Sequence, residues 1–139
     1  MSEKTITLIS TDKAPGAIGP YSQAVQAGGF VFISGQISLE PRTGSVVEGG
    51  IREQTDQVMK NIGGILNSQG LGYNDIVKTE IYLKDMNDFS VVNEVYGSYF
   101  QDTHKPARVT LEVSRLPRDV LVEISCTAYA RQESRNTSR

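Results

Sequence analysis

Only two stretches of this chain have the periodicity of an amphipathic helix, and that number limits how a sheet can be covered. Apolar side chains recur three and four positions apart in residues 51–69, and a second stripe runs from Phe89 to Phe100. This spacing is typical of a helix with one buried face. Residues 76–84 alternate from one face to the other, which is typical of a half-buried strand. The chain is therefore predicted to combine two helices with a β-sheet.

Five further strands are predicted, separated by turns that contain glycine or proline. They cover residues 6–9, 21–27, 30–34, 107–113 and 120–130. Gly28-Gly29 indicates a hairpin between the second and third of the chain's strands. The last two strands are expected to form another hairpin through residues 114–119. The predicted order is β-β-β-α-β-α-β-β, an α+β fold with a mixed sheet.

One face of the predicted sheet has no cover within the chain. The two helices cover a single face, and the sequence offers no third helix for the other. An uncovered apolar sheet face is typical of proteins that bind copies of themselves. We therefore expect self-association through this face.

Two local features concern the helices. Gly63-Gly64 lies inside the first helix, where each glycine costs about 1 kcal/mol relative to alanine. Close packing of this helix on the sheet would explain the two glycines. Asn87 or Asp88 can cap the second helix.

Composition excludes several classes of function. Fourteen basic residues face sixteen acidic ones, so the overall balance gives no electrostatic footprint for nucleic acid, although it leaves room for a local basic patch. His104, expected to be an ordinary loop residue, and Cys126, expected to be inert core, are the only residues of their types. One histidine and one cysteine cannot form a typical zinc site or an intrachain disulfide, and no metal site is expected. The absence of a phosphate-binding glycine loop and of a dinucleotide motif predicts a reaction without a cofactor.

The chain is expected to be a cytoplasmic protein of one domain. Its first eleven residues include no apolar segment, and no stretch approaches the roughly 20 apolar residues of a membrane span. The length fits a single domain, predicted over residues 1–131. Residues 132–139 have no aliphatic or aromatic side chain and are predicted to be a disordered tail.

The last predicted hairpin carries the residues best suited to chemistry. If it folds symmetrically about Leu116-Pro117, Thr110 lies opposite Glu123, and both join Arg108 on the face without helix cover. An arginine binds a carboxylate through two parallel hydrogen bonds, and a nearby carboxyl can orient a water or relay a proton. The alternative is a cross-strand Arg–Glu ion pair that only stabilises the sheet, and spacing alone favours this alternative.

Four other residues are weaker candidates. Tyr21 follows Gly19-Pro20, where an aromatic ring can line a pocket, although core packing is the more common role. Ser34 and Gly35 lie at a strand end that offers a hydroxyl and open backbone amides, but Gly35 is as well suited to a bulge or turn. Asn93 lies beside the apolar stripe of the second helix, so its amide needs a partner from the backbone or a ligand.

Several segments resemble the motifs of the Rid (reactive intermediate deaminase, or YjgF) family. They occur in the family's order and spacing, and the resemblance extends over nearly the whole chain. The matching segments are Ala14-Pro15-Gly16-Ala17-Ile18-Gly19-Pro20-Tyr21-Ser22-Gln23, Ser34-Gly35-Gln36, Val92-Asn93-Glu94-Val95-Tyr96, Lys105-Pro106-Ala107-Arg108, Arg115-Leu116-Pro117-Arg118-Asp119 and Val122-Glu123-Ile124.

This resemblance implies a chorismate-mutase-like α+β fold, packed as a homotrimer with clefts between subunits. It implies hydrolysis of reactive enamines and imines, such as 2-aminoacrylate, 2-iminopropanoate and 2-iminobutanoate, to 2-keto acids and ammonia without a cofactor. By matching positions, Arg108 would bind the substrate carboxylate and Glu123 would help hold the attacking water. The residues that would line or support the cleft are Tyr21, Ser34, Gly35 and Asn93.

Position 110 departs from the family pattern. Many members of the deaminase branch have a cysteine two residues after the arginine, where this chain has Thr110. A thiol mechanism is therefore excluded at this position, whereas a contribution from the backbone carbonyl is open to threonine as well.

Two other functions compete with the deaminase. A non-catalytic protein that binds a 2-keto acid or another small metabolite as a regulator would use the same arginine. An endoribonuclease is disfavoured, because the sequence has no basic stripe, no aromatic stacking platform and a single histidine.

Overall fold

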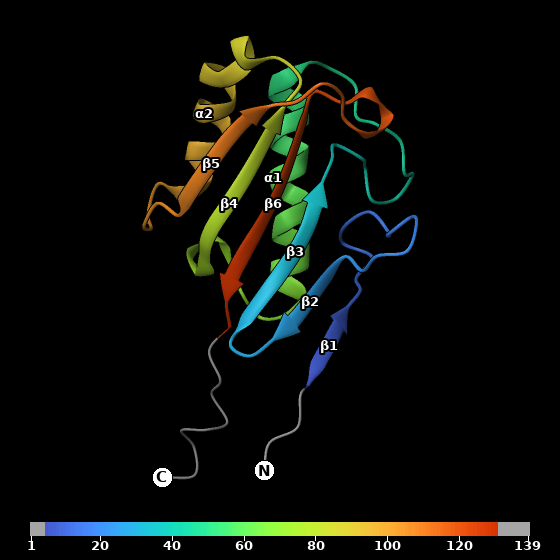
Figure 1. The fold of residues 1–139 in the computed structure, drawn as a ribbon, viewed down its shortest axis with the longest axis vertical. Coiled ribbons are helices and arrows are strands. Elements are labelled where there is room, and N and C mark those ends of the chain that lie inside the picture. Colours follow the sequence, from blue (N-terminus) through green and yellow to red (C-terminus); the bar gives the residue numbers. More distant parts are fainter. Residues whose placement is uncertain (1–4, 131–139) are drawn as a thin grey trace.

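A computed structural model describes residues 5–130, and its helices and strands follow one another in the predicted order (Figure 1). The strands are β1 (Ile6–Ile9), β2 (Ala24–Ala27), β3 (Phe30–Gln36), β4 (Ile76–Leu83), β5 (Ala107–Glu112) and β6 (Val122–Tyr129), and the helices are α1 (Ile51–Ser68) and α2 (Phe89–Gly97). The predicted tail over residues 132–139 and the predicted domain boundary at residue 131 lie outside the described residues.

The six strands form one mixed sheet in the order β1-β2-β3-β6-β4-β5. Neighbouring strands are antiparallel except β4 and β5, which are parallel. The hairpin predicted at Gly28-Gly29 is confirmed, since Ala27 pairs with Phe30 on either side of it. The α+β fold with a mixed sheet is therefore confirmed.

The second predicted hairpin is wrong. β5 does not pair with β6, because β4 lies between them: Thr110 is in register with Ile81, and Ile81 with Ile124. The connection from β4 to β5 runs through α2, and a helical crossover of this kind returns the chain parallel to the strand it left. β6, whose alternate residues are buried along its whole length, takes the central place instead. The expected pairing of Thr110 with Glu123 does not exist.

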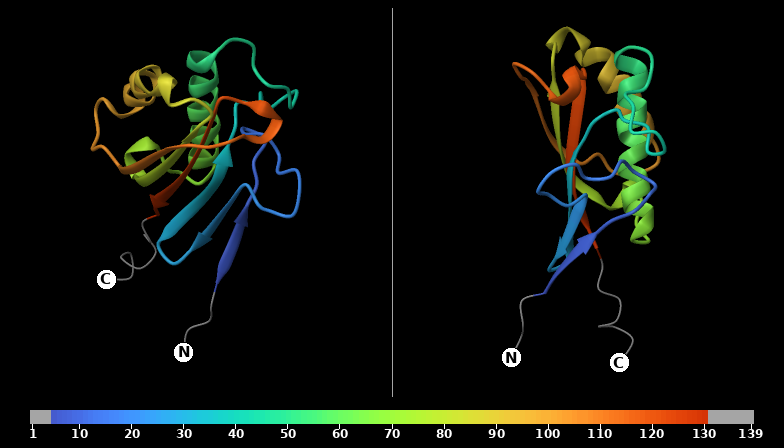
Figure 2. Two further views of the ribbon diagram at one scale, coloured as in Figure 1. Left: turned by 45° about the horizontal axis from the view of Figure 1, so that its top comes forward. Right: turned by 90° about the vertical axis from the view of Figure 1, so that its right-hand side faces the viewer.

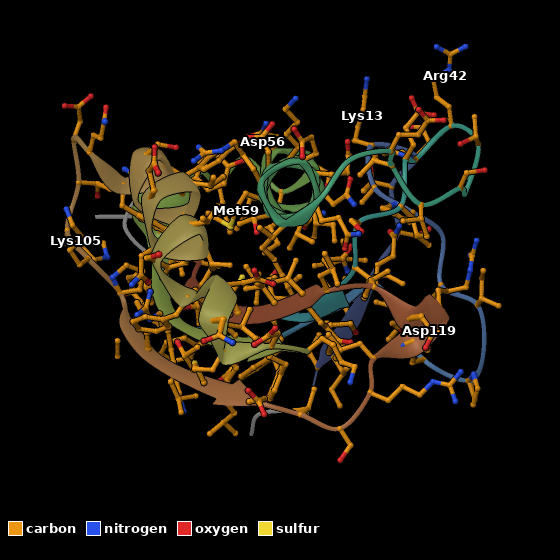
Figure 3. The ribbon with its side chains drawn as sticks, turned by 90° about the horizontal axis from the view of Figure 1, so that it is seen from above. Lys13, Arg42, Asp56, Met59, Lys105 and Asp119 are labelled. Atoms are coloured by element: carbon orange, nitrogen blue, oxygen red, sulfur yellow. The ribbon has the colours of Figure 1, made fainter. Side chains whose placement is uncertain are left out.

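Both helices lie on one face of the sheet (Figure 2). Viewed from above, α1 and α2 run side by side, with Met59 among the buried side chains between α1 and the strands (Figure 3). The opposite sheet face exposes large apolar side chains, as predicted. They include Phe30, Phe32, Val109, Leu111 and Tyr129.

Close packing explains the two glycines of α1, but the sheet is not the neighbour. A Cβ added at Gly64 would overlap the backbone carbonyl of Lys13, and one at Gly63 would overlap the hydroxyl of Tyr73. That hydroxyl donates to the carbonyl of Met59 at 2.8 Å. The glycines therefore let a loop and a tyrosine approach the helix.

The start of α2 follows the prediction only in part. Asp88 occupies the cap position but forms no side-chain hydrogen bond there. The Asp85 carboxylate accepts instead from the backbone N–H of Asn87 at 2.9 Å, within the short 3-10 turn before the helix. Within residues 5–130, none of the helices has the length and apolar character needed to cross a membrane.

Candidate functional site

Arg108 lies near the start of the edge strand β5 and turns toward α2. It is in register with Thr79, whose hydroxyl is buried against α2, and residues in register share a sheet face. Its Nη1 donates to Oδ1 of Asn93 at 2.8 Å. Its guanidinium carbon lies 5.5 Å from the ring centroid of Phe89 and 5.3 Å from that of Tyr96. We call these four residues, Arg108, Asn93, Phe89 and Tyr96, the arginine site.

The arginine site contains no carboxylate. Among residues 5–130, the carboxylates within ion-pair distance of an arginine belong to Glu94 and Asp119, which pair with Arg52 and Arg115. Every recorded partner of Arg108 is neutral: one amide oxygen and two ring faces. The ion-pair alternative for Arg108 and Glu123 is therefore wrong in this chain, and the guanidinium keeps its full charge for a ligand.

Glu123 lies in the central strand β6 on the open face of the sheet. Its neighbours Val122 and Ile124 are buried toward the helices, so its own side chain points the other way. A Cβ at Gly35 would overlap the Glu123 carboxylate, which shows how closely the carboxylate approaches the β3 backbone. Burial raises the pKa of the Glu123 carboxyl above its ordinary value. A carboxyl of raised pKa is suited to exchange a proton with a bound water.

A pocket of about 230 Å³ opens beside Gly35, and we call it together with Glu123 the glutamate pocket. Its walls are mostly apolar, with Tyr21 exposed at its edge. The lining residues are Pro15, Gly16, Ile18, Tyr21, Gln23, Gly35, Gln36, Ile37, Leu39, Pro117 and Arg118. The pocket has the character of a site for a small molecule, apolar with a few polar groups.

Two residues hold the wall of this pocket in place. The Ser34 hydroxyl donates to the carbonyl of Ser22 at 2.6 Å. This bond fixes the backbone directly after Tyr21 against β3. Gln23 is buried; its Nε2 donates to the carbonyl of Pro15 at 2.7 Å, and its Oε1 accepts from the N–H of Thr11 at 2.7 Å. Sequence reasoning missed Gln23, because a glutamine at the start of a strand carries no signal that it is buried.

Thr110 shares the helix-side face of β5 with Arg108, as their spacing predicts. Its hydroxyl is buried and has no hydrogen-bond partner among the described residues. The threonine side chain is therefore not part of a hydrogen-bond network at the arginine site.

Arg108 and Glu123 lie on opposite faces of the sheet, which corrects the prediction that Arg108, Thr110 and Glu123 share the open face. β4 separates β5 from β6, a distance of about 10 Å across two strand spacings. Within one chain, Arg108 and Glu123 therefore cannot contact the same small ligand.

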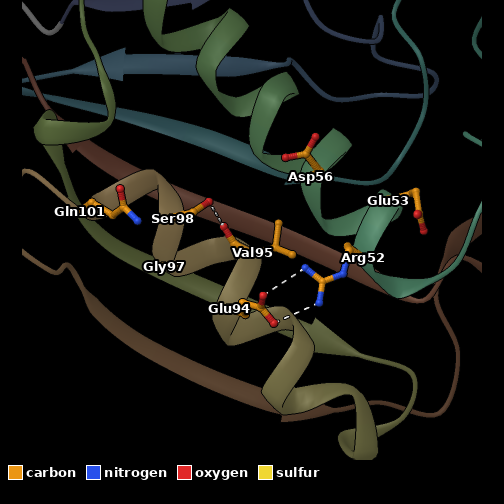
Figure 4. Close-up of a pocket in the computed structure, with 8 residues that line it drawn as sticks. All are labelled: Arg52, Glu53, Asp56, Glu94, Val95, Gly97, Ser98 and Gln101. Atoms are coloured by element: carbon orange, nitrogen blue, oxygen red, sulfur yellow. Dashed lines mark hydrogen bonds and ion pairs between the residues drawn. The ribbon is translucent and has the colours of Figure 1, made fainter.

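A more spacious groove lies between α1 and α2 (Figure 4). It measures about 660 Å³, and its one basic lining residue, Arg52, is paired with the Glu94 carboxylate. The Arg52 guanidinium donates to both carboxylate oxygens of Glu94, at 3.4 and 3.0 Å. This pairing lowers the pKa of the Glu94 carboxyl and leaves no free charge on either residue for a ligand.

The one histidine and the one cysteine, His104 and Cys126, both stabilise the fold. His104 does more than predicted for a loop residue, since its Nε2 lies 2.8 Å from the carbonyl of Ile76 and ties the loop to the start of β4. Cys126 is buried in the core, as predicted, and burial raises the pKa of its thiol to about 12. Within residues 5–130 no group of three His, Cys, Asp or Glu side chains is placed to hold a metal ion.

Sequence reasoning also missed the roles of Phe89 and Tyr96, which it assigned to the apolar stripe. A signal was present: Phe89, Asn93 and Tyr96 are spaced i, i+4, i+7, which puts them on one side of a helix. That spacing lets one polar group from another element contact all three residues, as Arg108 does.

Known proteins match this chain over most of its length. The sequence model of one family, described as endoribonuclease L-PSP, matches residues 11–130. A RutC family protein of Pyrococcus horikoshii is 57% identical over 122 residues, which cover 88% of this chain and 96% of the relative. A mouse protein named 2-iminobutanoate/2-iminopropanoate deaminase is 50% identical over 128 residues, covering 92% of this chain and 94% of that protein. A solved Yersinia pestis structure, described as a conserved Rid family protein of unknown function, superposes with a TM-score of 0.89 at 47% identity, over 91% of this chain and 100% of the other.

Proposed function

The chain belongs to the Rid (YjgF) family, and we propose that it hydrolyses reactive 2-imino acids and their enamine tautomers to 2-keto acids and ammonia. The observation that carries this proposal is the uncompensated charge of Arg108, which only neutral groups hold. A guanidinium in this state is suited to bind the one anionic group of such substrates, their carboxylate. The proposed substrates are 2-iminopropanoate, with its tautomer 2-aminoacrylate, and 2-iminobutanoate, the two imines in the mouse relative's name.

The reaction needs few groups because the imine carbon is already electrophilic. Arg108 holds the carboxylate, and Glu123 holds a water against the C=N carbon and accepts its proton as the C–O bond forms. The imine nitrogen gains protons and leaves as ammonia when the tetrahedral intermediate collapses to the ketone. The water supplies the keto oxygen, so R–C(=NH)–COO⁻ and H₂O give R–CO–COO⁻ and NH₃.

We propose that two copies of the chain complete each site within a homotrimer. Arg108 of one copy would then meet Glu123 and the glutamate pocket of the next, since one chain holds them on opposite sheet faces. The exposed apolar side chains of the open face, such as Phe32, Leu111 and Tyr129, support association through that face. The cytoplasm is the proposed compartment, a reducing one that suits the unpaired thiol of Cys126.

The reaction is tested by a coupled assay. A pyridoxal-phosphate dehydratase generates 2-aminoacrylate, and the rate of pyruvate release is measured with and without this protein. Faster release supports a deaminase. Binding of 2-keto acids without faster release would identify a non-catalytic metabolite-binding protein instead.

The shared site is tested by mixing two inactive variants. Arg108→Ala and Glu123→Gln chains, expressed together, form mixed trimers in which one of the three sites has both native residues. Random mixing should restore about one quarter of the native activity. No recovery in trimers that light scattering shows to be mixed and intact would mean that each chain supplies its whole site.

A further inference from the structure

We propose that Phe89 and Tyr96 form an aromatic clamp that positions the Arg108 guanidinium for a carboxylate ligand, and that Thr79 holds Tyr96 in place. This inference rests on the proposed function only for the identity of the ligand. The clamp itself is described by the contacts of the arginine site. Phe89 and Tyr96 are positioning residues, because they act through Arg108.

The clamp joins two elements that approach each other at the edge of the sheet. Arg108 extends from β5, and the two rings extend from the first and the last full turn of α2 on the same side. Asn93 lies between the rings along the helix and binds Nη1 of the guanidinium. The remaining N–H groups of the fork have no recorded partner among the described residues.

A clamp of neutral groups does something that a carboxylate partner cannot do. Ring faces attract a cation through their quadrupole, without cancelling its charge. A carboxylate would hold Arg108 more firmly, but the substrate would then compete with it. An arginine held by rings and an amide has fewer accessible rotamers before the ligand arrives, so less conformational entropy is lost on binding.

A hydrogen bond to the sheet fixes the position of the Tyr96 ring. The Tyr96 hydroxyl lies 2.8 Å from the hydroxyl of Thr79, and this buried hydrogen bond joins α2 to β4. Thr79 on β4 is in register with Arg108 on β5. The register between these two strands therefore places the Arg108 side chain beside the threonine that holds the Tyr96 ring. Burial raises the pKa of the Tyr96 hydroxyl, which keeps it protonated for this bond.

Ordinary core packing explains Tyr96 but not Phe89. Tyr96 is 6% exposed, and its ring centroid lies 4.9 Å from that of Phe100, as expected of a core residue. Phe89 is 37% exposed, and the ring contact recorded for it is the one with Arg108. Phe89 is therefore the residue that separates the clamp from packing.

The test compares Phe89→Leu with the matched control Phe89→Tyr, which keeps the ring face. The first readout is the Nε–Hε resonance of Arg108 in the full-length protein, which ring currents shift. We expect this resonance to move in Phe89→Leu and to stay near its native position in Phe89→Tyr. An unchanged resonance in Phe89→Leu would overturn the clamp.

The second readout is ligand affinity. Phe89→Leu should raise KM for the imine, and Kd for 2-oxobutanoate measured by calorimetry, by about 3- to 30-fold, with kcat within about twofold. Thr79→Val, which removes the bond to Tyr96, should raise both by a smaller factor. Equal affinities of Phe89→Leu and the native protein would overturn the positioning role.

The two proposals fail in different ways. Native protein that binds 2-oxobutanoate through the clamp but does not speed pyruvate release would contradict the deaminase and support the clamp. Native protein that releases pyruvate, with Phe89→Leu as efficient as Phe89→Tyr, would contradict the clamp and support the deaminase.

Discussion

Two consecutive residues of α2 each bind an arginine, and only one of the two arginines has its charge balanced by its partner. Glu94 binds Arg52 of α1 as a carboxylate, and the pair is neutral (Figure 4). Asn93 binds Arg108 of β5 as an amide, and the charge of that arginine stays uncompensated. The neutral pair lies in the groove of about 660 Å³, whereas Arg108 lines neither this groove nor the glutamate pocket.

Under the proposed function, charge balance distinguishes the catalytic region better than cavity size does. The α1–α2 groove has more room, but Arg52, its one basic lining residue, is paired with Glu94 on an exposed surface, where water weakens charge–charge interactions. The carboxylates of Glu123 and Glu94 differ in the same way: of these two, only that of Glu94 is paired with an arginine among the described residues. Glu123 has no recorded cation partner among the described residues and a raised pKa, while Arg52 lowers the pKa of Glu94.

The largest expected effect separates the two arginines. Arg108→Ala should reduce kcat/KM by tens- to thousands-fold, because loss of a charged partner costs about 2–5 kcal/mol in a site that the next copy of the proposed trimer would desolvate. Arg52→Ala should change kcat/KM by less than about twofold. Thermal melting should show both variants folded. Full activity in Arg108→Ala, or inactivity only through unfolding, would contradict the proposed role of this residue.

A related variant sharpens this result. Arg108→Lys keeps the charge but loses the fork and its fit between two rings, so it should also be strongly impaired. Activity near the native level in Arg108→Lys would mean that charge alone is required.

The next largest difference is expected between the effects on kcat of replacing Glu123 and of replacing Glu94. Glu123→Gln should lower kcat by about ten- to a hundredfold, near the lower end for proton-transfer groups, because the imine carbon is already reactive. Glu94→Gln should leave kcat nearly unchanged. Steady-state pyruvate release measures both, and equal effects of the two substitutions would remove the distinction between the regions.

The pH dependence follows from the raised pKa of Glu123. Its carboxylate, the form that accepts a proton from water, is present above that pKa and is lost as the pH falls through it. The acid side of the rate profile should therefore lie at higher pH than an ordinary glutamate would give. Glu94→Gln should keep this acid limb, and Glu123→Gln should lack it. A limb retained in Glu123→Gln would assign the titration to another group.

A smaller pair of effects concerns two glycines. Gly35→Ala should displace the Glu123 carboxylate, whose atoms occupy the space of the new methyl group, and reduce kcat several-fold with little loss of stability. Gly97→Ala, in the wall of the α1–α2 groove, meets nothing within 4 Å and should be neutral or slightly stabilising. Native activity in Gly35→Ala would show that the carboxylate can move without consequence.

The smallest effect is expected at Thr110. Its buried hydroxyl has no partner among the described residues, so Thr110→Val, Thr110→Ala and Thr110→Cys should all keep most of the activity. Thr110→Val should melt at the native temperature or above, because an unpaired buried hydroxyl costs about 1–3 kcal/mol. Large losses in Thr110→Val and Thr110→Ala with recovery in Thr110→Cys would instead show that the side chain takes part.

The helices and strands could be predicted from the sequence because their periods are local. The neighbours of β5 could not, since nothing in the alternation of residues 107–113 says which strand it pairs with. The alternation correctly put Arg108 and Thr110 on one side of β5, but it could not say which side faces the helices. As an edge strand at the margin of α2, β5 turns its polar face to the helix and exposes Val109 and Leu111 on the open face.

The candidate residues were predicted mainly from their resemblance to family motifs, and spacing alone favoured an ion pair. The structure removes that ion pair, because Arg108 and Glu123 point to opposite faces. Phe89 and Tyr96, the aromatic partners of Arg108, were predicted only as core residues. The spacing of an apolar stripe is the same whether its aromatic rings pack on a sheet or contact a cation.

The strand order also has a consequence for how the chain folds. β4, α2 and β5 form one continuous unit that contains the whole arginine site, and their strands pair across a short separation, Lys78 with Ala107. The pair of Phe30 with Tyr129 instead joins residues 99 positions apart in the sequence. Closing a longer loop loses more chain entropy, and contacts near in sequence form faster. The arginine site is therefore expected to assemble early, whereas Glu123 reaches its place only when β6 enters the sheet between β3 and β4.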